Sequence, residues 1–153
     1  MKKPQHHPEF IEVIHTLEPL LRRYLPLRRM ELDDLCDWIS WYWNRGTMSY
    51  VIDRDEPLGV CLIRLFRRLE QFMDRDAHEP CGKFCFIELS VAKDGEIMGL
   101  MLKDLENRWG PQEVMMFDRG ERTENGAPRM MKWETFKKLA RRLSNGAKTC
   151  LSK

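Results

Sequence analysis

The chain has 153 residues and a mass of 18.3 kDa, and its net charge is only +2 although 33% of its residues are charged. This length predicts one domain with a sizeable core, and the small net charge provides no general field that would favour a nucleic-acid partner. No apolar run reaches the roughly 20 residues of a membrane helix, and the first residues lack the apolar centre of a signal peptide, so we expect no membrane association and a cytoplasmic location.

We expect residues 1–153 to form a single domain with flexible ends at residues 1–8 and 144–153. The odd number of cysteines favours reduced thiols over a disulfide framework. Cys81 and Cys85 are four positions apart, but no second pair of ligands has a matching spacing, so the sequence predicts no metal site. The remaining cysteines are Cys36, Cys61 and Cys150.

Helical periodicity dominates the first third of the chain. Residues 8–24 carry an apolar stripe, and the internal Pro19 predicts that this helix breaks and restarts. His15 lies beside the stripe, where a structural histidine is a commoner finding than a catalytic one. A second helix is expected at residues 31–44, and Gly46 supplies its stop signal.

A β-hairpin is expected next. Residues 47–52 and 59–66 have strand composition, and the segment DRDEPL between them has strong turn character. We expect Arg64 and the following arginines to be solvated. Residues 67–82 predict a short helix and then a loop, in which His78 is either a surface histidine or a group that reaches an active site.

The most informative stretch runs from residue 83 to residue 117. Residues 83–91 are almost continuously apolar, residues 97–109 have helical spacing, and residues 113–117 form a second apolar run. Gly110-Pro111 ends the helix, so the pattern predicts a βαβ unit with parallel strands. The free backbone N–H groups of residues 94–98 at the start of this helix would favour an anion such as a phosphate.

The last part of the chain begins with a polar segment, residues 118–129, in which Asn125-Gly126 predicts a turn. A terminal helix is expected at residues 131–143, with Trp133 and Phe136 on its apolar face and lysines and arginines opposite. This basic face is typical of a solvated helix surface, although nucleic acid or an acidic carrier protein would also suit it.

The turn at Gly95-x-Ile97-x-Gly99 resembles the pyrophosphate loop of the GNAT superfamily of acyltransferases, which follows a central strand and opens a helix. The outer glycines match, whereas Ile97 replaces the middle glycine and Asp94 stands where a basic or amide residue often precedes the loop. The resemblance implies a GNAT-like α/β fold: N-terminal helices, a mixed twisted sheet, a central βαβ unit and a C-terminal helix.

The same resemblance implies that the cofactor is acetyl-CoA or another acyl-CoA. Its pantetheine arm would be held near Leu89, Ser90 and Val91. Its pyrophosphate would be held by the turn, which consists of Asp94, Gly95, Glu96, Ile97, Met98 and Gly99.

Residues 48–139 also resemble the acyltransferases that activate RTX toxins, which are GNAT-like and move a fatty acyl group from acyl carrier protein to lysine. Glu88 would match the acidic residue in the central strand of that family, and His15 is the nearest candidate for its N-terminal histidine. This resemblance implies an acyl carrier protein as the donor and a protein lysine as the acceptor.

Glu88 is the candidate catalytic residue, because it interrupts an otherwise apolar strand and a buried carboxylate needs a partner or a function. A carboxylate at this position would remove the proton of an attacking amine. The alternative is a carboxylate that reaches solvent or bonds a structural partner. The general acid is missing, since Tyr24, Tyr42 and Tyr50 all precede the central strand.

The leading hypothesis is therefore an N-acyltransferase that moves an acyl group from acyl-CoA, or from acyl carrier protein, to a small-molecule amine or a protein lysine. The altered glycine pattern and the missing late tyrosine favour an alternative, a degenerate scaffold that acts as a non-enzymatic protein-binding module. A nucleic-acid-binding protein is a third and weaker hypothesis, which rests only on the terminal helix.

Overall fold

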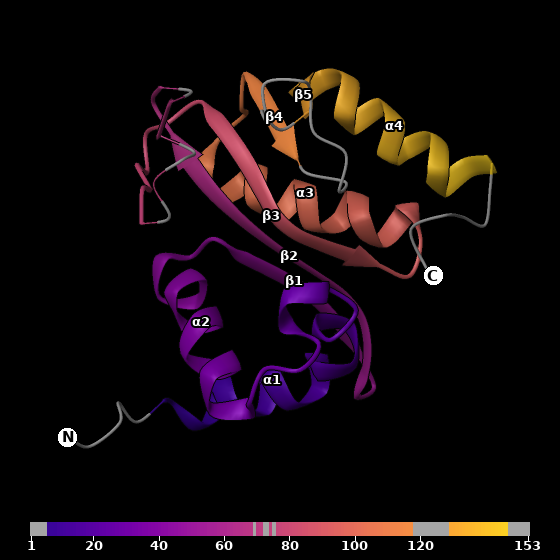
Figure 1. The fold of residues 1–153 in the computed structure, drawn as a ribbon. Helices are drawn as coiled ribbons and strands as arrows, with labels where there is room; N and C mark the ends of the chain where they lie inside the picture. The colour runs from indigo at the N-terminus through magenta and orange to yellow at the C-terminus, as the bar shows by residue number, and fades with distance from the viewer. Residues whose placement is uncertain (1–5, 69, 72–73, 75, 118–128, 147–153) are drawn as a thin grey trace.

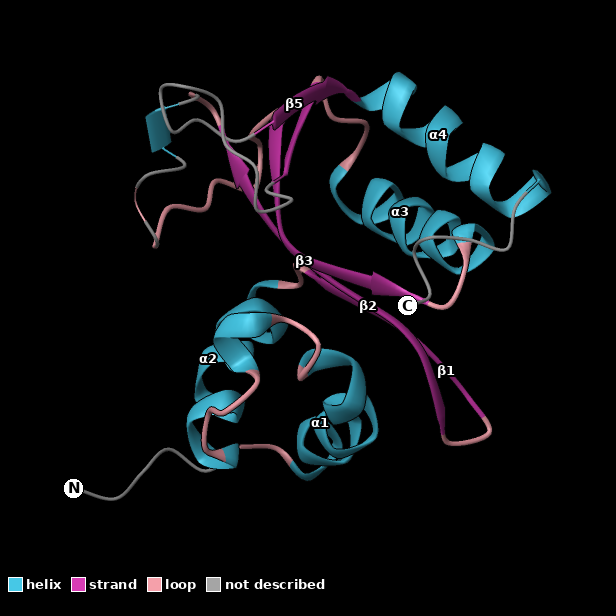
Figure 2. Ribbon diagram, turned by 45° about the vertical axis from the view of Figure 1, so that its right-hand side comes forward, coloured by secondary structure: helices cyan, strands magenta, loops and turns pink. Residues whose placement is uncertain are grey.

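The computed structural model describes residues 6–68, 70–71, 74, 76–117 and 129–146. Its centre is a five-stranded mixed sheet in the order β1-β2-β3-β4-β5, so neighbours along the chain are also neighbours in the sheet. Helices α1 and α2 lie on one face and α3 and α4 on the other (Figures 1 and 2). The α/β class and the terminal helices are thus as predicted.

The first helix, α1 (Pro8–Leu21), runs through Pro19 without a break, which corrects the prediction of a restart. Pro19 is exposed and only two residues from the end of α1, so the lost hydrogen bond affects the last turn alone. At the start of the described chain, His6 Nε2 lies 2.8 Å from Asp37, and the His7 ring accepts the Glu9 N–H. Residues 1–5 and 147–153 lie outside the described residues.

A short 3-10 turn, η1 (Leu25–Leu27), leads to α2 (Leu32–Arg45). The expected stop at Gly46 is confirmed, because Gly46 has a φ of 71° and its N–H bonds the Trp43 carbonyl at 3.2 Å. Glycine tolerates this left-handed conformation, which closes the end of the helix.

Strands β1 (Met48–Asp53) and β2 (Glu56–Phe66) form the predicted hairpin. Its turn is shorter than the expected six residues and consists of Arg54 and Asp55, both with positive φ (49° and 64°). Two such residues give the backbone twist that suits a tight hairpin. β2 then pairs antiparallel with β3 (Phe84–Ala92).

The predicted βαβ unit is confirmed: α3 (Gly95–Trp109) connects β3 to the parallel strand β4 (Val114–Phe117). β5 (Arg129–Lys132) returns antiparallel to β4 and runs into α4 (Trp133–Gly146). The terminal helix therefore begins two residues later than predicted, because Met131 and Lys132 pair with β4 instead. The expected turn at Asn125-Gly126 lies outside the described residues.

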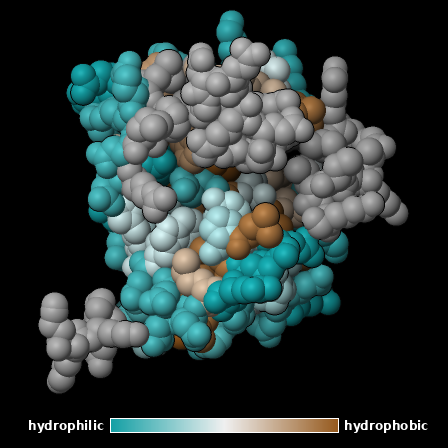
Figure 3. Space-filling model, in the orientation of Figure 1, coloured by the Kyte–Doolittle hydropathy of each residue, from teal (hydrophilic) through white to brown (hydrophobic). Residues whose placement is uncertain are grey.

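Two apolar clusters hold the layers together. The side chains of β2 alternate between them, so that Val60 and Leu62 face α1 and α2 whereas Cys61 and Ile63 face α3. The first cluster includes Phe10, Ile14, Leu17, Leu21, Leu35, Ile39 and Leu89, and the second includes Cys85, Ile87, Met98, Met101, Leu102, Leu105 and Trp133. On the face shown in Figure 3, a small hydrophobic area lies near the middle, with hydrophilic residues below it.

Candidate functional site

The parallel strands β3 and β4 are paired over only part of β3. The register joins Phe84–Ile87 of β3 to Val114–Phe117 of β4, whereas β3 itself continues to Ala92. In the part of the chain that the structure describes, residues 89–92 therefore have a strand partner only on the β2 side, and Glu88 has none on either side. Figure 2 shows this end of β3 extending beside α3. Backbone N–H and C=O groups along such an edge are available to a ligand.

A β-bulge lies at the point where the pairing with β4 ends. Leu62 of β2 is opposite Leu89 and Ile63 is opposite Ile87, which leaves Glu88 as the extra residue of β3. A bulge bends the strand and re-aims a side chain. Ile87 belongs to the α3 cluster and Leu89 to the cluster under α1 and α2.

The Glu88 carboxylate bonds a buried arginine. Its Oε2 lies 3.3 Å from Arg64 Nε, and the side chains of Arg64 and Glu88 are 5% and 22% exposed. Arg64 Nη1 also donates to the Asp74 carbonyl at 2.6 Å, and the guanidinium carbon lies 5.2 Å from the ring centres of both Phe66 and Phe86. The expectation that Arg64 is solvated is therefore wrong, because the loop after β2 covers it. Of the two interpretations of Glu88, its bond with a structural partner is observed, and its catalytic role stays a prediction.

The turn after β3 begins α3 as predicted, but its first polar groups already have partners. The Asp94 carboxylate accepts the Ile97 N–H at 2.9 Å, and the Asp94 carbonyl accepts the Met98 N–H at 3.1 Å. The amides of Gly95 and Glu96 have no hydrogen-bond partner among the described residues. Asp94 is therefore an N-cap that engages two of the donors predicted for an anion, those of Ile97 and Met98.

Several side chains of the predicted cofactor site point into the protein. Met98 is 3% exposed, and its sulfur accepts the Ser90 hydroxyl at 3.2 Å. Leu89 is buried under α1 and α2, and Val91 packs against the same cluster. Ile97 packs against the α3 side of the sheet. The structure thus brings residues 88–99 together, but mainly their backbone could contact a cofactor.

Gly99 of α3 differs from Gly59 of β2 in the space beside its backbone. A Cβ at Gly99 would have no atom of the described residues within 4 Å, whereas a Cβ at Gly59 would lie 2.7 Å from Ile97 Cγ2 and 2.9 Å from Met101 Cε. Gly59 therefore allows α3 to approach β2, while the surface over Gly99 is open. Side chains of a helix lean toward its N-terminus, so a residue at position 99 would cover the free amides of Gly95 and Glu96.

Alanine substitutions at Gly99 and Gly59 are expected to change the free energy of unfolding in opposite directions. We expect Gly99→Ala to raise the free energy of unfolding by about 0.5–1 kcal/mol, because alanine is the better helix former. Gly59→Ala should lower it by about 1–3 kcal/mol through overpacking. Urea denaturation of both variants measures the effects. A loss of stability in Gly99→Ala would show that the space over Gly99 is occupied.

His78 is half-buried between elements, which corrects the prediction of a surface histidine. Its Nδ1 accepts the Leu65 N–H at 3.4 Å, and its ring lies 6.0 Å from Trp41 and 5.6 Å from Trp109 in edge-to-face contacts. Burial lowers the pKa of His78, and the Arg45 charge lowers it further. The neutral ring with Nδ1 as acceptor carries its hydrogen on Nε2. His78 thus attaches the loop that covers Arg64 to the sheet.

The lowered pKa of His78 makes the free energy of unfolding depend on pH. Since the folded pKa of His78 lies below the unfolded value of about 6.5, the unfolded chain binds the proton first, and stability falls as the pH decreases below that value. We expect a lower free energy of unfolding at pH about 5.5 than at about 7.5. In His78→Asn, whose amide oxygen can replace Nδ1 as the acceptor, the difference between the two values should be smaller. An unchanged pH dependence in this variant would exclude His78 as its source.

The other candidate residues lie away from this site. His15 is exposed on α1 and lines an open pocket of about 490 Å³ with Ile52 and Asp55. Two further pockets, of about 480 and 450 Å³, lie at the connection after α1 and at the edge of β1. None of the residues that line these three pockets belongs to residues 88–99.

Cysteines 36, 61 and 85 are buried free thiols and Cys81 is exposed, whereas Cys150 lies outside the described residues. The described part of the chain holds no cluster of three or more His, Cys, Asp or Glu side chains that could bind a metal ion. Within the same ranges, no helix combines the length and apolar composition needed to cross a bilayer.

Comparisons with known proteins gave no match. No family model, curated protein or solved structure matches the chain.

Proposed function

We propose that this chain is an N-acyltransferase with a GNAT-like arrangement of elements, which binds acyl-CoA at the unpaired end of β3. The observation that carries the proposal is that the pairing of β3 with β4 extends, among the described residues, only to Ile87 and Phe117, whereas β3 continues to Ala92. A pantetheine arm contains two amide groups, which can bond the free edge of residues 88–92 as an added strand would. Support thus comes from backbone groups near Leu89, Ser90 and Val91.

The start of α3 supplies the position for the pyrophosphate. The amides of Gly95, which is buried, and of Glu96, which is exposed, have no hydrogen-bond partner among the described residues, and no described atom lies over Gly99. A helix N-terminus favours an anion at such amides. The carboxylates of Asp94 and Glu96 oppose it, so the proposal expects weaker CoA binding than a basic or amide-rich loop would provide.

In the proposed reaction, Glu88 acts as the base. Its Oε2 is engaged by Arg64, and 22% of the side chain is exposed to solvent. The amine nitrogen attacks the thioester carbonyl and the C–S bond breaks. The amine proton passes to Glu88 directly or through water, and CoA leaves as the thiolate, which takes a proton from solvent; Glu88 then releases its proton to solvent. The acceptor is a small-molecule amine or a protein lysine, and acyl carrier protein is the alternative donor.

Calorimetric and thermal-shift titrations with acetyl-CoA, longer acyl-CoAs and free CoA test the proposal. A ligand that binds only the folded chain stabilises it by about 2.7 kcal/mol at a hundredfold excess over its dissociation constant. Gly99→Trp should abolish binding by covering the first turn of α3, whereas Gly99→Ala is the matched control that keeps the surface nearly open. Binding that is equal in both variants would exclude this turn as the pyrophosphate site.

A second candidate is a degenerate acyltransferase scaffold that binds another protein without catalysis. Two observations favour it: Asp94 already uses the Ile97 amide, and Glu88 is already bonded to Arg64. This candidate predicts no binding of any acyl-CoA or of acyl carrier protein. Transfer of a radiolabelled acyl group to any amine by the wild type, and its loss in Glu88→Gln with folding intact, would exclude it.

A further inference from the structure

Strand β1 forms one edge of the sheet, so its outer side has no strand partner among the described residues. The Ile63 N–H bonds the Thr47 carbonyl at 3.0 Å, which shows that residue 47 directs its backbone toward β2. Backbone directions alternate along an edge strand, so Met48 and Tyr50 direct their backbone groups outward. β2 lies between this edge and β3, so a ligand at β1 is independent of acyl transfer.

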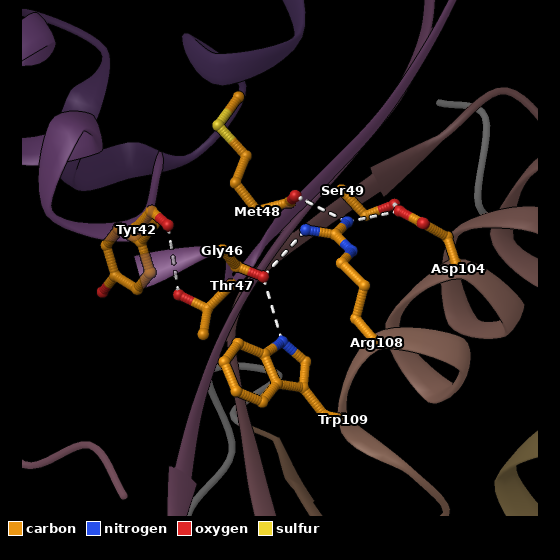
Figure 4. A network of polar contacts seen from close by, with 8 residues as sticks. All are labelled: Tyr42, Gly46, Thr47, Met48, Ser49, Asp104, Arg108 and Trp109. Carbon is orange, nitrogen blue, oxygen red and sulfur yellow. Dashed lines mark hydrogen bonds and ion pairs between the residues drawn. The ribbon is translucent and has the colours of Figure 1, made fainter. Parts of the chain in front are cut away.

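The beginning of this edge, where the pocket of about 450 Å³ lies, is occupied by a side chain of α3. Arg108 Nη1 donates to the Gly46 carbonyl at 2.8 Å, and Arg108 Nη2 donates to the outward carbonyl of Met48 at 2.9 Å (Figure 4). Arg108 also forms an ion pair with Asp104, which accepts the Ser49 hydroxyl at 2.7 Å. The charges of Asp104 and Arg108 are thus paired with each other, and the Met48 carbonyl is already used.

The end of the edge, in contrast, is open. The register with β2 shifts after Val51, yet Ile52 still faces outward, because Asp53 closes the two-residue hairpin turn and directs its backbone toward β2. Pro57, which lies opposite Ile52, has no N–H to donate to it. Tyr50 and Ile52 thus present two N–H and two C=O groups outward, and no loop, helix or side chain among the described residues bonds them.

An open pocket of about 490 Å³ lies beside this end of β1, between α1 and the hairpin turn. Its lining residues are Glu12, Val13, His15, Thr16, Ile52 and Asp55. The Ile52 side chain packs against the cluster under α1 and α2, so it points to the α1 face of the sheet. Side chains directly opposite each other on neighbouring strands lie on the same face. A residue opposite Ile52 on an added strand would therefore direct its side chain into this pocket.

The pocket beside Ile52 has an excess of negative charge. Glu12 and Asp55 line it without a hydrogen bond or ion pair to their carboxylates among the described residues, and no lysine or arginine lines it. The hairpin end adds the exposed carboxylates of Asp53 and Glu56 against the single guanidinium of Arg54. Four carboxylates and one guanidinium leave a formal charge of −3 with histidine neutral, so a basic side chain is the complementary occupant.

We propose that the end of β1 binds an extended polypeptide segment as an added strand, with a lysine or arginine opposite Ile52 and an apolar residue opposite Tyr50. The segment's backbone bonds the outward groups of Tyr50 and Ile52, which gives affinity, and its alternate side chains give specificity. The basic side chain reaches Glu12 and Asp55. The apolar one lies beside Tyr50, whose ring is nearly parallel to that of Trp43, at 16° with centres 6.2 Å apart.

NMR titration of the whole chain with a capped Thr-Lys-Thr-Val-Thr peptide tests the proposal. We expect saturable shifts of the Tyr50 and Ile52 amide signals. N-methylation of the peptide at its lysine and valine removes the N–H groups that face β1 and should weaken binding at least about tenfold. N-methylation at the central threonine, whose N–H faces away, is the matched control and should change affinity by less than about twofold. A norleucine analogue, which lacks the charge, should bind at least about tenfold more weakly.

Charge variants of the chain complete the test. Glu12→Gln combined with Asp55→Asn should weaken binding of the lysine peptide at least about tenfold and leave that of the norleucine analogue nearly unchanged. Asparagine tolerates the positive φ of residue 55, which is 64°. Glu113→Gln, at an exposed position just before β4, is the control and should bind as the wild type does. Equal affinity for the lysine and norleucine peptides, undiminished binding after N-methylation at lysine and valine, or a dimer of the free chain that buries the β1 edge would each overturn the proposal.

Discussion

Replacement of Glu88 by alanine is expected to lower the free energy of unfolding by about 3–4 kcal/mol. The variant would remove the Glu88 carboxylate from the Arg64 guanidinium, whose side chain is only 5% exposed. Arg64 would keep the Asp74 carbonyl as an acceptor, but a carbonyl does not neutralise a buried charge. The measurement is urea denaturation followed by tryptophan fluorescence.

A double variant distinguishes the effect of the Arg64–Glu88 ion pair on stability from the effect of the volume that the two side chains fill. Arg64→Met combined with Glu88→Leu replaces both charges by apolar side chains, and such replacements are often neutral for stability. We therefore expect the double variant to recover most of the loss. If Glu88→Ala alone changed stability by less than about 0.5 kcal/mol, the bulge would be open enough for water to reach Arg64.

This prediction also affects how catalysis is tested. Because Glu88 supports the fold, a loss of acyl transfer in an alanine variant would not distinguish a missing base from a destabilised sheet. Glu88→Gln keeps the shape and can still accept the Arg64 N–H. Its activity should be compared with its stability at the same temperature, so that the two roles are measured separately.

The βαβ unit could be predicted from the sequence because its signals are local. The change from an apolar run to helical spacing after residue 91, and the stop at Gly110, both lie within about 35 residues. The hairpin was predictable for the same reason, since its strands are adjacent in the chain. β5 was missed, because four residues with no clear alternation give a weak signal before a strongly amphipathic helix.

The contacts that define the sites could not be predicted in this way. Arg64 occurs in an apolar strand, and only the loop that returns over it decides that it is buried. The pocket at β1 depends on Ser49 and Asp104, which are 55 positions apart. A sequence pattern shows which face of an element is apolar, but it does not show which polar groups on different elements meet.

Replacement of Trp133 by alanine should cost about 4 kcal/mol, because truncation of a buried tryptophan typically costs 3–5 kcal/mol. Trp133 is the first residue of α4 and is 2% exposed. It packs in the cluster with Met101 and Leu105 of α3, and its indole N–H donates to Glu106 Oε2 at 2.8 Å. Denaturation in urea gives the loss directly.

Trp133→Phe is the matched control, since it keeps most of the apolar contact and removes the indole donor. Its cost should be about 1–2 kcal/mol. Burial alone would raise the pKa of Glu106, but the bonds from Trp133 and Lys137 outweigh it and lower the pKa. We therefore expect the pKa of Glu106, measured by NMR, to rise in Trp133→Phe.

Hydrogen exchange then decides how α4 is coupled to the rest of the domain. If Trp133→Ala lowers amide protection equally in α3 and in the sheet, α4 belongs to the same cooperative unit as the core. If protection is lost in α4 alone while the global unfolding energy is unchanged, Trp133 only attaches a helix that opens by itself. The buried indole and its bond to Glu106 favour the first result, because both connect α4 directly to the helix that packs on the sheet.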